Sequence, residues 1–207
     1  MLNFDARFEH YTDPYHLHRA MGALDAAQTR SLFDTAPTGA VPIKRDDPSH
    51  KKQYSMHLRY LRKRNVVEDI VARLAEPWRT LVDDLTSPVF EDWICDGTGL
   101  ALRDLPVDIG VYSHRSGDFI SIHMDKPTKA LTAILYLNPD WPVDAGGAYE
   151  MRGSADPADP PVRCFHPTAG QFIAFAPTRQ SWHAVSPVSA EAPVRLTVQL
   201  EYWFNDN

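Results

Sequence analysis

The sequence predicts a mainly β protein with flanking α-helices, arranged as a β-sandwich or jelly roll. After residue 100, eight short β-rich runs alternate with Gly, Pro and Asp turn signals. Aromatic residues make up 11% of the chain and 17 residues are proline, which favours strands and turns over a helical bundle. Because 207 residues suit one domain, we expect a single domain over 1–207, with a mostly helical region at 1–100 and the jelly roll at 101–207.

The first hundred residues are expected to provide helical support and a lid region. Residues 17–33 carry apolar side chains on roughly one helical face, and residues 66–85 do the same. Pro77 lies inside the second run and is expected to divide it into two helices. Between the two runs, the basic segment 44–64 concentrates positive charge. We expect it to be a solvated loop and helix face, with a lid or partner-docking surface as the alternative.

The second half of the chain provides the predicted strands. In chain order, the runs are VDIGVYS, DFISIHMD, ALTAILYLN, GGAYEMRG, VRCFHP, QFIAFAP, SWHAVSPV and VRLTVQLEYWF. The Pro- and Asp-rich segment 153–161 interrupts them and is expected to be a surface loop.

Composition argues against several classes of protein. The formal net charge of −6 does not suit a general binder of nucleic acid or of anionic membranes. No stretch approaches the length of apolar sequence that a transmembrane helix needs, and the first residues lack the pattern of a secretory signal. Cys95 and Cys164 cannot form a disulfide framework. We therefore expect a cytoplasmic protein.

Three residues form a candidate metal site. His123 and Asp125 end a predicted strand, where residues i and i+2 project from the same face and can converge on one ion. His183, in a later predicted strand, is the best candidate for a third ligand. Two histidines and one carboxylate are the ligand set of non-haem Fe(II) oxygenases, which leaves coordination positions open for a co-substrate and O2. For the His-x-Asp motif alone, the alternative is a strand-end histidine paired with an aspartate.

A second candidate feature is an arginine in the last predicted strand. The run 194–204 alternates, so Leu196 and Val198 face one way while Arg195 and Thr197 face the other. An arginine and a hydroxyl are costly in a dry core, but together they make a good receptor for a carboxylate. The alternative is an edge-strand arginine that faces solvent.

The ordered set of motifs resembles the prolyl-hydroxylase-like 2-oxoglutarate- and Fe(II)-dependent dioxygenases. The resemblance rests on VYSHRSGDFISIHMD, ALTAILYLNPDW, GGAYEMR, FHPTAGQFIAFAP, WHAVSPV and VRLT, and it spans residues 107–204. It implies a double-stranded β-helix, also called a distorted jelly roll, with 101–207 as the catalytic core. It also implies iron ligation by His123, Asp125 and His183.

The resemblance further implies a binding site for 2-oxoglutarate. Arg195 falls on the position that binds the distal carboxylate, with Thr197 as the accompanying hydroxyl. The remaining positions expected on the walls of this site are Tyr136, Ile134 and Tyr112. Gly146 and Gly147 match a Gly-Gly pair that opens a strand where backbones approach closely.

The implied activity is the oxidation of an unactivated C–H bond with Fe(II), 2-oxoglutarate and O2, giving succinate and CO2 as co-products. The related halogenases carry a small residue in place of the ligand carboxylate, so Asp125 favours hydroxylation, desaturation or cyclisation. The small size of the chain favours a small-molecule substrate, such as an amino acid or a biosynthetic intermediate. Candidate contacts for an anionic or amino-acid-like substrate are His114, Arg115, Arg152 and the segment 44–64.

Several alternatives remain open at this point. The chain could be a protein or peptide prolyl-type hydroxylase, a metal-binding jelly roll that does not use 2-oxoglutarate, or a non-catalytic binding domain on the same scaffold. A homodimer is one option for the quaternary state.

Overall fold

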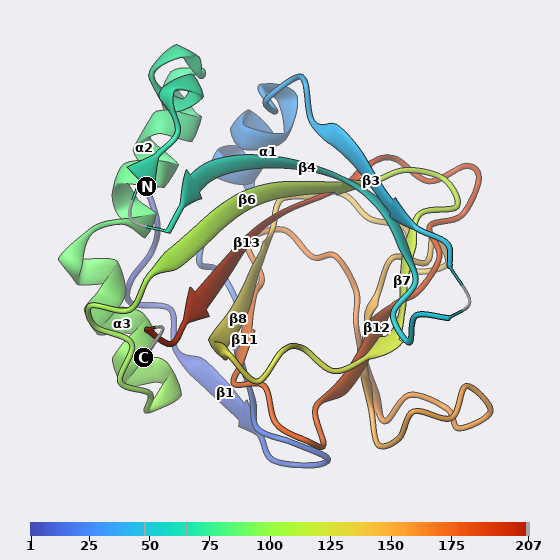
Figure 1. Cartoon of the computed structure of the whole chain (residues 1–207). Coiled ribbons are helices and arrows are strands. Elements are labelled where there is room, and N and C mark those ends of the chain that lie inside the picture. The colour runs from blue at the N-terminus through green and yellow to red at the C-terminus, as the bar shows by residue number, and fades with distance from the viewer. Residues whose placement is uncertain (48, 65, 206–207) are drawn as a thin grey trace.

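The structure is a computed structural model that describes residues 1–47, 49–64 and 66–205. Its dominant feature is one 13-stranded antiparallel sheet that curls into an open barrel (Figure 1). The first five strands are β1 (Phe8–Tyr11), β2 (Leu17–Ala20), β3 (Val41–Arg45), β4 (Tyr54–Lys63) and β5 (Val66–Val67). The other eight are β6 (Val107–His114), β7 (Phe119–His123), β8 (Lys129–Tyr136), β9 (Tyr149–Arg152), β10 (Arg163–Phe165), β11 (Phe172–Phe175), β12 (Trp182–Val185) and β13 (Arg195–Trp203).

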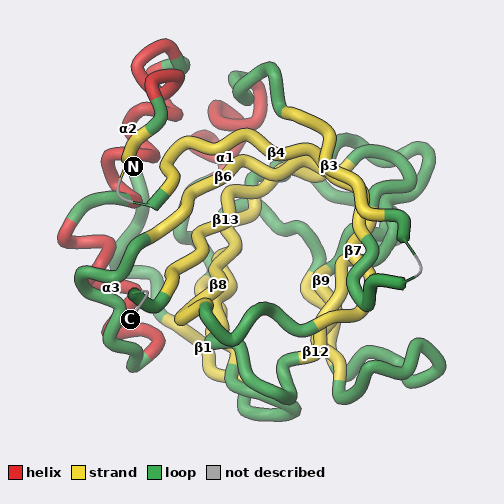
Figure 2. The backbone as a smooth tube through the Cα atoms, viewed as in Figure 1, coloured by secondary structure: helices red, strands yellow, loops and turns green. Residues whose placement is uncertain are grey.

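Strands distant in sequence lie side by side in this sheet. The strand order is β1-β2-β11-β8-β13-β6-β4-β7-β12-β9-β10, and β3 and β5 both pair with β4. The two outermost strands approach each other through side chains: the Tyr11 and Phe165 ring centroids are 5.3 Å apart, and the Arg163 guanidinium lies 5.0 Å from the Tyr11 ring centroid. The predicted mainly β, jelly-roll fold is confirmed (Figure 2).

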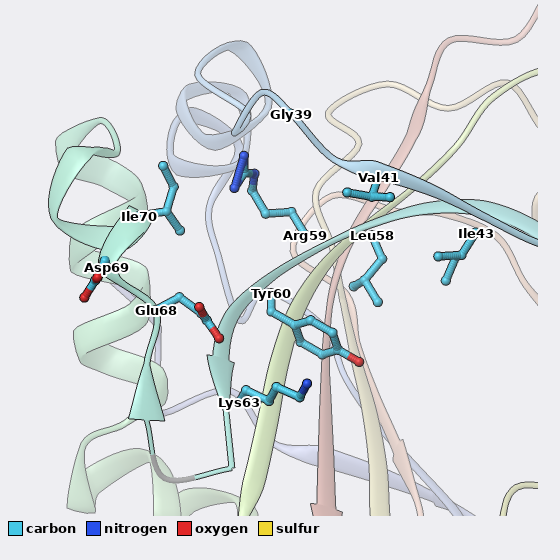
Figure 3. Close-up of a pocket in the computed structure, with 10 residues that line it drawn as sticks. All are labelled: Gly39, Val41, Ile43, Leu58, Arg59, Tyr60, Lys63, Glu68, Asp69 and Ile70. Carbon is cyan, nitrogen blue, oxygen red and sulfur yellow. The ribbon is translucent and has the colours of Figure 1, made fainter.

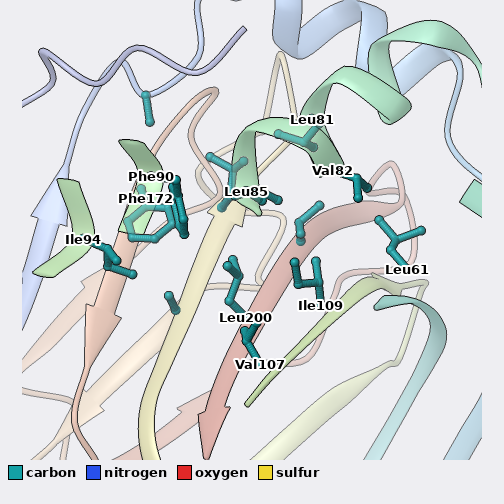
Figure 4. Close-up of a cluster of buried hydrophobic side chains, with 14 of the residues drawn as sticks. Leu61, Leu81, Val82, Leu85, Phe90, Ile94, Val107, Ile109, Phe172 and Leu200 are labelled. Carbon is teal, nitrogen blue, oxygen red and sulfur yellow. The ribbon is translucent and has the colours of Figure 1, made fainter. Parts of the chain in front are cut away.

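Helices cover one outer face of the sheet. They are α1 (Ala26–Asp34), the 3-10 helix η1 (Asp69–Arg73), α2 (Glu76–Leu85) and α3 (Pro88–Thr98). Apolar residues of α2, including Leu81, Val82 and Leu85, are buried against the sheet strands (Figure 4). Burial of each such side chain contributes about 1.5–3 kcal/mol, so this layer holds the barrel wall in place. None of the helices in the described ranges is long and apolar enough to cross a membrane.

The predicted elements of the second half are confirmed, since strands β6 to β13 fall one each within the eight runs, except that β6 and β8 each extend one residue beyond theirs. The predicted break at Pro77 is also observed: η1 precedes it, and α2 carries this proline in its first turn, where a missing N–H costs nothing. Residues 153–161 contain no helix or strand, as expected for a loop.

The expectation of a mostly helical first half is wrong. Residues 17–33 do not form one helix, because 17–20 form β2 and α1 starts only after Asp25, whose side chain caps it. The basic segment 44–64 contains the end of β3 and the whole of β4, so the expected helix face is wrong, while the described residues between the two strands form a loop. Apolar residues alternate with polar ones from Tyr54 to Tyr60, and a β-bulge before Arg62 then breaks the pattern. β4 lies between β6 and β7, so the sheet continues across residue 100, and the single-domain assignment over 1–207 stays a prediction.

The two faces of β13 connect the fold to the site. Leu196, Val198 and Leu200 pack into the core under the helices. Strand alternation therefore turns Arg195 and Thr197 to the opposite face, which is the interior of the barrel. The predicted alternation of this strand is observed.

Candidate active site

The barrel interior brings together the three residues predicted to bind a metal. His123 ends β7, His183 lies in β12, and the two are direct cross-strand partners whose ring centroids are 4.1 Å apart. Asp125 follows in the loop to β8. One ligand atom from each residue lies within 4.8 Å of the others, which is close enough for all three to hold one ion.

Both imidazoles are oriented for ligation. Each Nδ1 lies 2.8 Å from the carbonyl oxygen two residues earlier, that of Ser121 for His123 and that of Ser181 for His183. Each Nδ1–H therefore donates, and each Nε2 keeps its lone pair for a metal. Burial lowers the pKa of both histidines, so the rings are neutral, as a metal ligand must be.

The two oxygens of Asp125 have different surroundings. Oδ2 accepts a hydrogen bond from the Thr132 hydroxyl at 2.7 Å. Oδ1 lies 3.6 Å from the His123 Nε2 and 3.3 Å from the Lys129 ammonium. Burial alone would raise the pKa of Asp125, but Lys129 and then His123 outweigh it and hold this pKa well below its ordinary value. Two neutral nitrogens and one ionised oxygen suit a divalent first-row metal such as Fe(II).

A second part of the interior surrounds Arg195. Its side chain is 0% exposed, and in the described ranges no carboxylate lies within ion-pair distance of it. Its Nε donates to the Gly147 carbonyl at 2.7 Å, and its guanidinium lies 5.2 Å from the Tyr136 ring centroid. A buried cation with no anionic partner is costly, so an anion is needed to complete this environment.

Four buried polar atoms near this guanidinium have no hydrogen-bond partner. They are Arg195 Nη2, Thr197 Oγ1, Tyr136 OH and His114 Nε2. The His114 Nδ1 lies 3.4 Å from an Arg195 nitrogen and can only accept there, which places the ring proton on Nε2. Burial, followed by the Arg195 charge, holds the pKa of His114 well below its usual range and keeps the ring neutral. The chamber thus offers several hydrogen-bond donors to a carboxylate.

The other residues predicted for co-substrate binding also lie on the interior walls. Thr197 is the cross-strand partner of both Tyr136 and Tyr112. Tyr112 is buried in a small cluster with Ile120 and Val185. Ile134 is buried opposite Gln199.

The structure places the three predicted substrate contacts in different parts of the molecule. His114 joins the Arg195 chamber, as described above. Arg115 is exposed in the turn between β6 and β7. Arg152 pairs with Glu150 at 2.7 Å on the face of β9 opposite Met151, which is buried inside the barrel. The structure therefore brings neither Arg115 nor Arg152 to the metal ligands.

Part of the basic segment borders an open hollow of about 430 Å³ beside β4. Figure 3 shows Leu58 and Tyr60 on one side of this strand and Arg59 on the other. Leu58 also packs against the Tyr112 cluster, so the hollow adjoins the barrel wall. Further along the segment, the Lys52 ammonium lies 4.0 Å from Asp125 Oδ1.

Three further residues contact Asp125 that the sequence does not predict there: Lys129, Thr132 and Lys52. A lysine that opens an otherwise apolar strand, as Lys129 does in KALTAILY, is the one signal that could have marked the first of them.

An interior His-Asp-His group beside a buried anion receptor in a curled jelly roll is an arrangement suited to a metal-dependent oxygenase. Residues 109–205 match the sequence profile of the 2OG-Fe(II) oxygenase superfamily. This match covers a little under half of the chain. Together with the fold and site, it makes the chain similar to the prolyl-hydroxylase-like 2-oxoglutarate- and Fe(II)-dependent oxygenases. Members of this superfamily use Fe(II), 2-oxoglutarate and O2, and the His-Asp-His group and the Arg195 chamber are suited to such an ion and co-substrate.

Two curated relatives are prolyl hydroxylases. Prolyl 3-hydroxylase OGFOD1 of Xenopus laevis is 29% identical over 119 residues, which cover 56% of this chain and 23% of that protein. The Mus musculus protein of the same name is 26% identical over 132 residues, which cover 62% of this chain and 24% of that protein. The chain thus spans about a quarter of the length of these relatives.

Solved structures share the fold at low sequence identity. A prolyl-4-hydroxylase from Pseudomonas putida aligns with a TM-score of 0.57 and 18% identity, covering 92% of this chain and 93% of that one. The α-ketoglutarate-dependent carbocyclase SnoK from nogalamycin biosynthesis aligns with a TM-score of 0.59 and 13% identity. The alignment covers 92% of this chain and 80% of that one.

Proposed function

We propose that the chain is a hydroxylase in which His123, Asp125 and His183 hold Fe(II) and Arg195 binds 2-oxoglutarate. It would oxidise an unactivated C–H bond of a small molecule, such as an amino acid or a biosynthetic intermediate, and release succinate and CO2. The observation that carries this proposal is the buried Arg195 guanidinium, which lacks a carboxylate partner among the described residues and lies among unpartnered polar atoms.

The protein's own residues have three tasks in this scheme. The two Nε2 atoms and one Asp125 oxygen would hold the iron, which supplies the oxidising chemistry when it is bound. Arg195, Thr197 and Tyr136 would orient 2-oxoglutarate through its distal carboxylate. The apolar walls would exclude bulk water from the site, so that oxidation is confined to the bound substrate.

Asp125 bears on the type of reaction. Its carboxylate is ionised and supported by Thr132, so it is suited to occupy a coordination position permanently. This favours hydroxylation, or another oxidation such as desaturation or cyclisation, over halogenation.

The residues around the metal ligands support a substrate that carries negative charge. Besides its 4.0 Å approach to Asp125, Lys52 lies 6.0 Å from the Tyr54 ring centroid, and the Arg45 guanidinium lies 5.3 Å from the same ring centroid. Among the described residues, Lys52 forms an ion pair with Asp125 only, and Arg45 forms none. An anionic group on a small molecule would match these cations.

A prolyl residue in a peptide is the second candidate substrate. The prolyl hydroxylases among the relatives and the open hollow beside β4 favour it. SnoK, which shares the fold, is a carbocyclase from nogalamycin biosynthesis and supports the small-molecule candidate instead. A metal-binding jelly roll that does not use 2-oxoglutarate would leave the Arg195 chamber without an occupant.

Anaerobic titration tests the proposal directly. Addition of Fe(II) and 2-oxoglutarate to the metal-free protein should produce a visible metal-to-ligand charge-transfer band, and Asp125→Ala should abolish it. The same preparation, exposed to O2 with panels of small anionic molecules and proline-containing peptides, should release succinate in step with the true substrate. Absence of the band in a folded protein contradicts the proposal. Succinate release driven only by peptides would select the second candidate.

A further inference from the structure

Lys129 occupies an unusual position beside the candidate metal site. It is the first residue of β8, four residues after Asp125, and only 8% of it is exposed. Its ammonium lies 2.7 Å from Glu201 Oε1 and 3.3 Å from Asp125 Oδ1. A single buried cation is therefore shared by two carboxylates, one of which is the proposed iron ligand.

The oxygen that Lys129 approaches is the one a metal would use. Oδ2 of Asp125 is already bonded to Thr132, whereas Oδ1 is turned toward the Nε2 of His123. A divalent cation held between those atoms would need the same lone pairs that now face the ammonium. The ammonium and the metal are thus alternative partners for Oδ1.

Glu201 provides the second partner for the ammonium. Glu201 lies in β13, and its cross-strand partner in β8 is Thr132, so the sheet register fixes it beside Asp125. The Lys129 ammonium also lies 5.5 Å from the Trp203 ring centroid, on the Glu201 side. When Oδ1 is occupied, the ammonium can keep a full ion pair with Glu201 without leaving its burial site.

From this geometry we infer that Lys129 and Glu201 are positioning residues that set the metal affinity of the site. Lys129 competes with the divalent cation for Asp125 Oδ1, and Glu201 favours metal binding by drawing the ammonium away. The inference rests on the proposed function, since it takes Asp125 as a ligand. It predicts opposite effects for the two charges of one ion pair, which a general loss of packing would not produce.

The test is the affinity of the metal-free protein for Co(II), measured by calorimetry and by visible absorption without 2-oxoglutarate. A charge within a few ångströms moves the proton affinity of a carboxylate by about one to three pKa units, and a divalent cation at the same oxygen feels the same field. We therefore expect Lys129→Met to bind Co(II) about tenfold more tightly and Glu201→Gln about tenfold more weakly. The double variant should match Lys129→Met, because Glu201 acts through Lys129.

Controls separate this inference from the proposed function. Near-UV circular dichroism establishes that each variant is folded, and Lys129→Gln replaces Lys129→Met if the latter does not fold. Asp125→Ala should lose Co(II) binding; if it does not, the ligand assignment itself fails. If Asp125→Ala behaves as expected, the inference alone is overturned by unchanged or weaker binding in the Lys129 variant. A Glu201→Gln effect that persists without Lys129 would overturn it as well.

Discussion

Arg195 and Gly147 are in close contact: the arginine Nε donates to the glycine carbonyl across 2.7 Å, and a Cβ on Gly147 would lie 3.0 Å from the Arg195 Cδ. Gly147 has φ +65°, a conformation that other residues rarely adopt. The glycine thus allows the backbone to orient the guanidinium, in agreement with the close approach expected for this Gly-Gly pair.

Substitution of this glycine should disturb Arg195 in particular. Gly147→Ala is expected to weaken 2-oxoglutarate binding and to destabilise the fold by about 1–3 kcal/mol, because it adds both backbone strain and a steric clash. Gly117→Ala is a matched control, since Gly117 has φ +79° but a Cβ added there would meet no atom within 4 Å among the described residues. Thermal unfolding and 2-oxoglutarate titration of both variants measure the difference. Equal 2-oxoglutarate affinities in the two variants would contradict the proposed contact.

Removal of the guanidinium should separate co-substrate binding from metal binding. Arg195→Leu is expected to weaken 2-oxoglutarate binding by about 2–3 kcal/mol, or tens- to hundreds-fold, because a charge-assisted carboxylate contact is lost. Co(II) affinity should stay near that of the wild type, since none of the three candidate ligands is altered. Calorimetric titration with each ligand in turn checks both statements. Parallel losses of both affinities would indicate a general collapse of the site.

Arg152 should prove structural. It pairs with Glu150, and its Nη2 donates to the backbone carbonyls of Asp156 and Asp159 in the loop 153–161. Arg152→Gln is therefore expected to cost about 1–3 kcal/mol of unfolding free energy, because the bonds that this buried guanidinium makes to Glu150 and to the loop are lost. The KM for 2-oxoglutarate should not change. Denaturant unfolding and steady-state kinetics measure the two quantities, and a large change in substrate KM with intact stability would restore Arg152 as a substrate contact.

The hairpin of β1 and β2 should make stability sensitive to acid. Burial, then the neighbouring His10 and His16, lower the pKa of His18 from 6.5 to about 4. The folded state therefore binds fewer protons at His18 than the unfolded state does. The stabilising contribution is fully present above pH 6.5 and is lost as pH falls toward 4.

Over this range the loss should amount to about 1–2 kcal/mol, once solvent screening at this edge hairpin is allowed for. Urea unfolding of the wild type and of His18→Gln at pH 7.5 and pH 5 measures it. The pH dependence should be smaller in the variant. Identical slopes in the two proteins would remove His18 as the cause.

The sequence predicts those features that depend on residues close together in the chain, and it does not predict those that depend on distant segments. The alternation in β13 is local, so it correctly places Arg195 and Thr197 on one face of a single strand. The alternation in β4 is equally local, but its polar face carries so many cations that it reads as a solvated segment. β2 was mistaken for the start of a helix because four residues are too few to distinguish the two periods.

The neighbours of Asp125 could not be predicted in the same way. The approach of Lys129 and Glu201 to this carboxylate depends on the register between β8 and β13 and on the path of the preceding loop. Apart from a lysine that opens an apolar strand four residues after Asp125, no short-range pattern marks these contacts. The same holds for His114, whose place beside Arg195 follows from the pairing of β6 with β13.

β1 and β10 contact each other through the side chains of Tyr11, Phe165 and Arg163, with no backbone hydrogen-bond ladder between them in the described ranges. This affects where the barrel wall opens locally. Separating β1 from β10 breaks only side-chain contacts, whereas separating a hydrogen-bonded pair of neighbouring strands breaks a row of backbone hydrogen bonds. Amide hydrogens of the two outermost strands should therefore exchange with deuterium sooner than those of β8 and β13. The barrel would open first at this contact between β1 and β10.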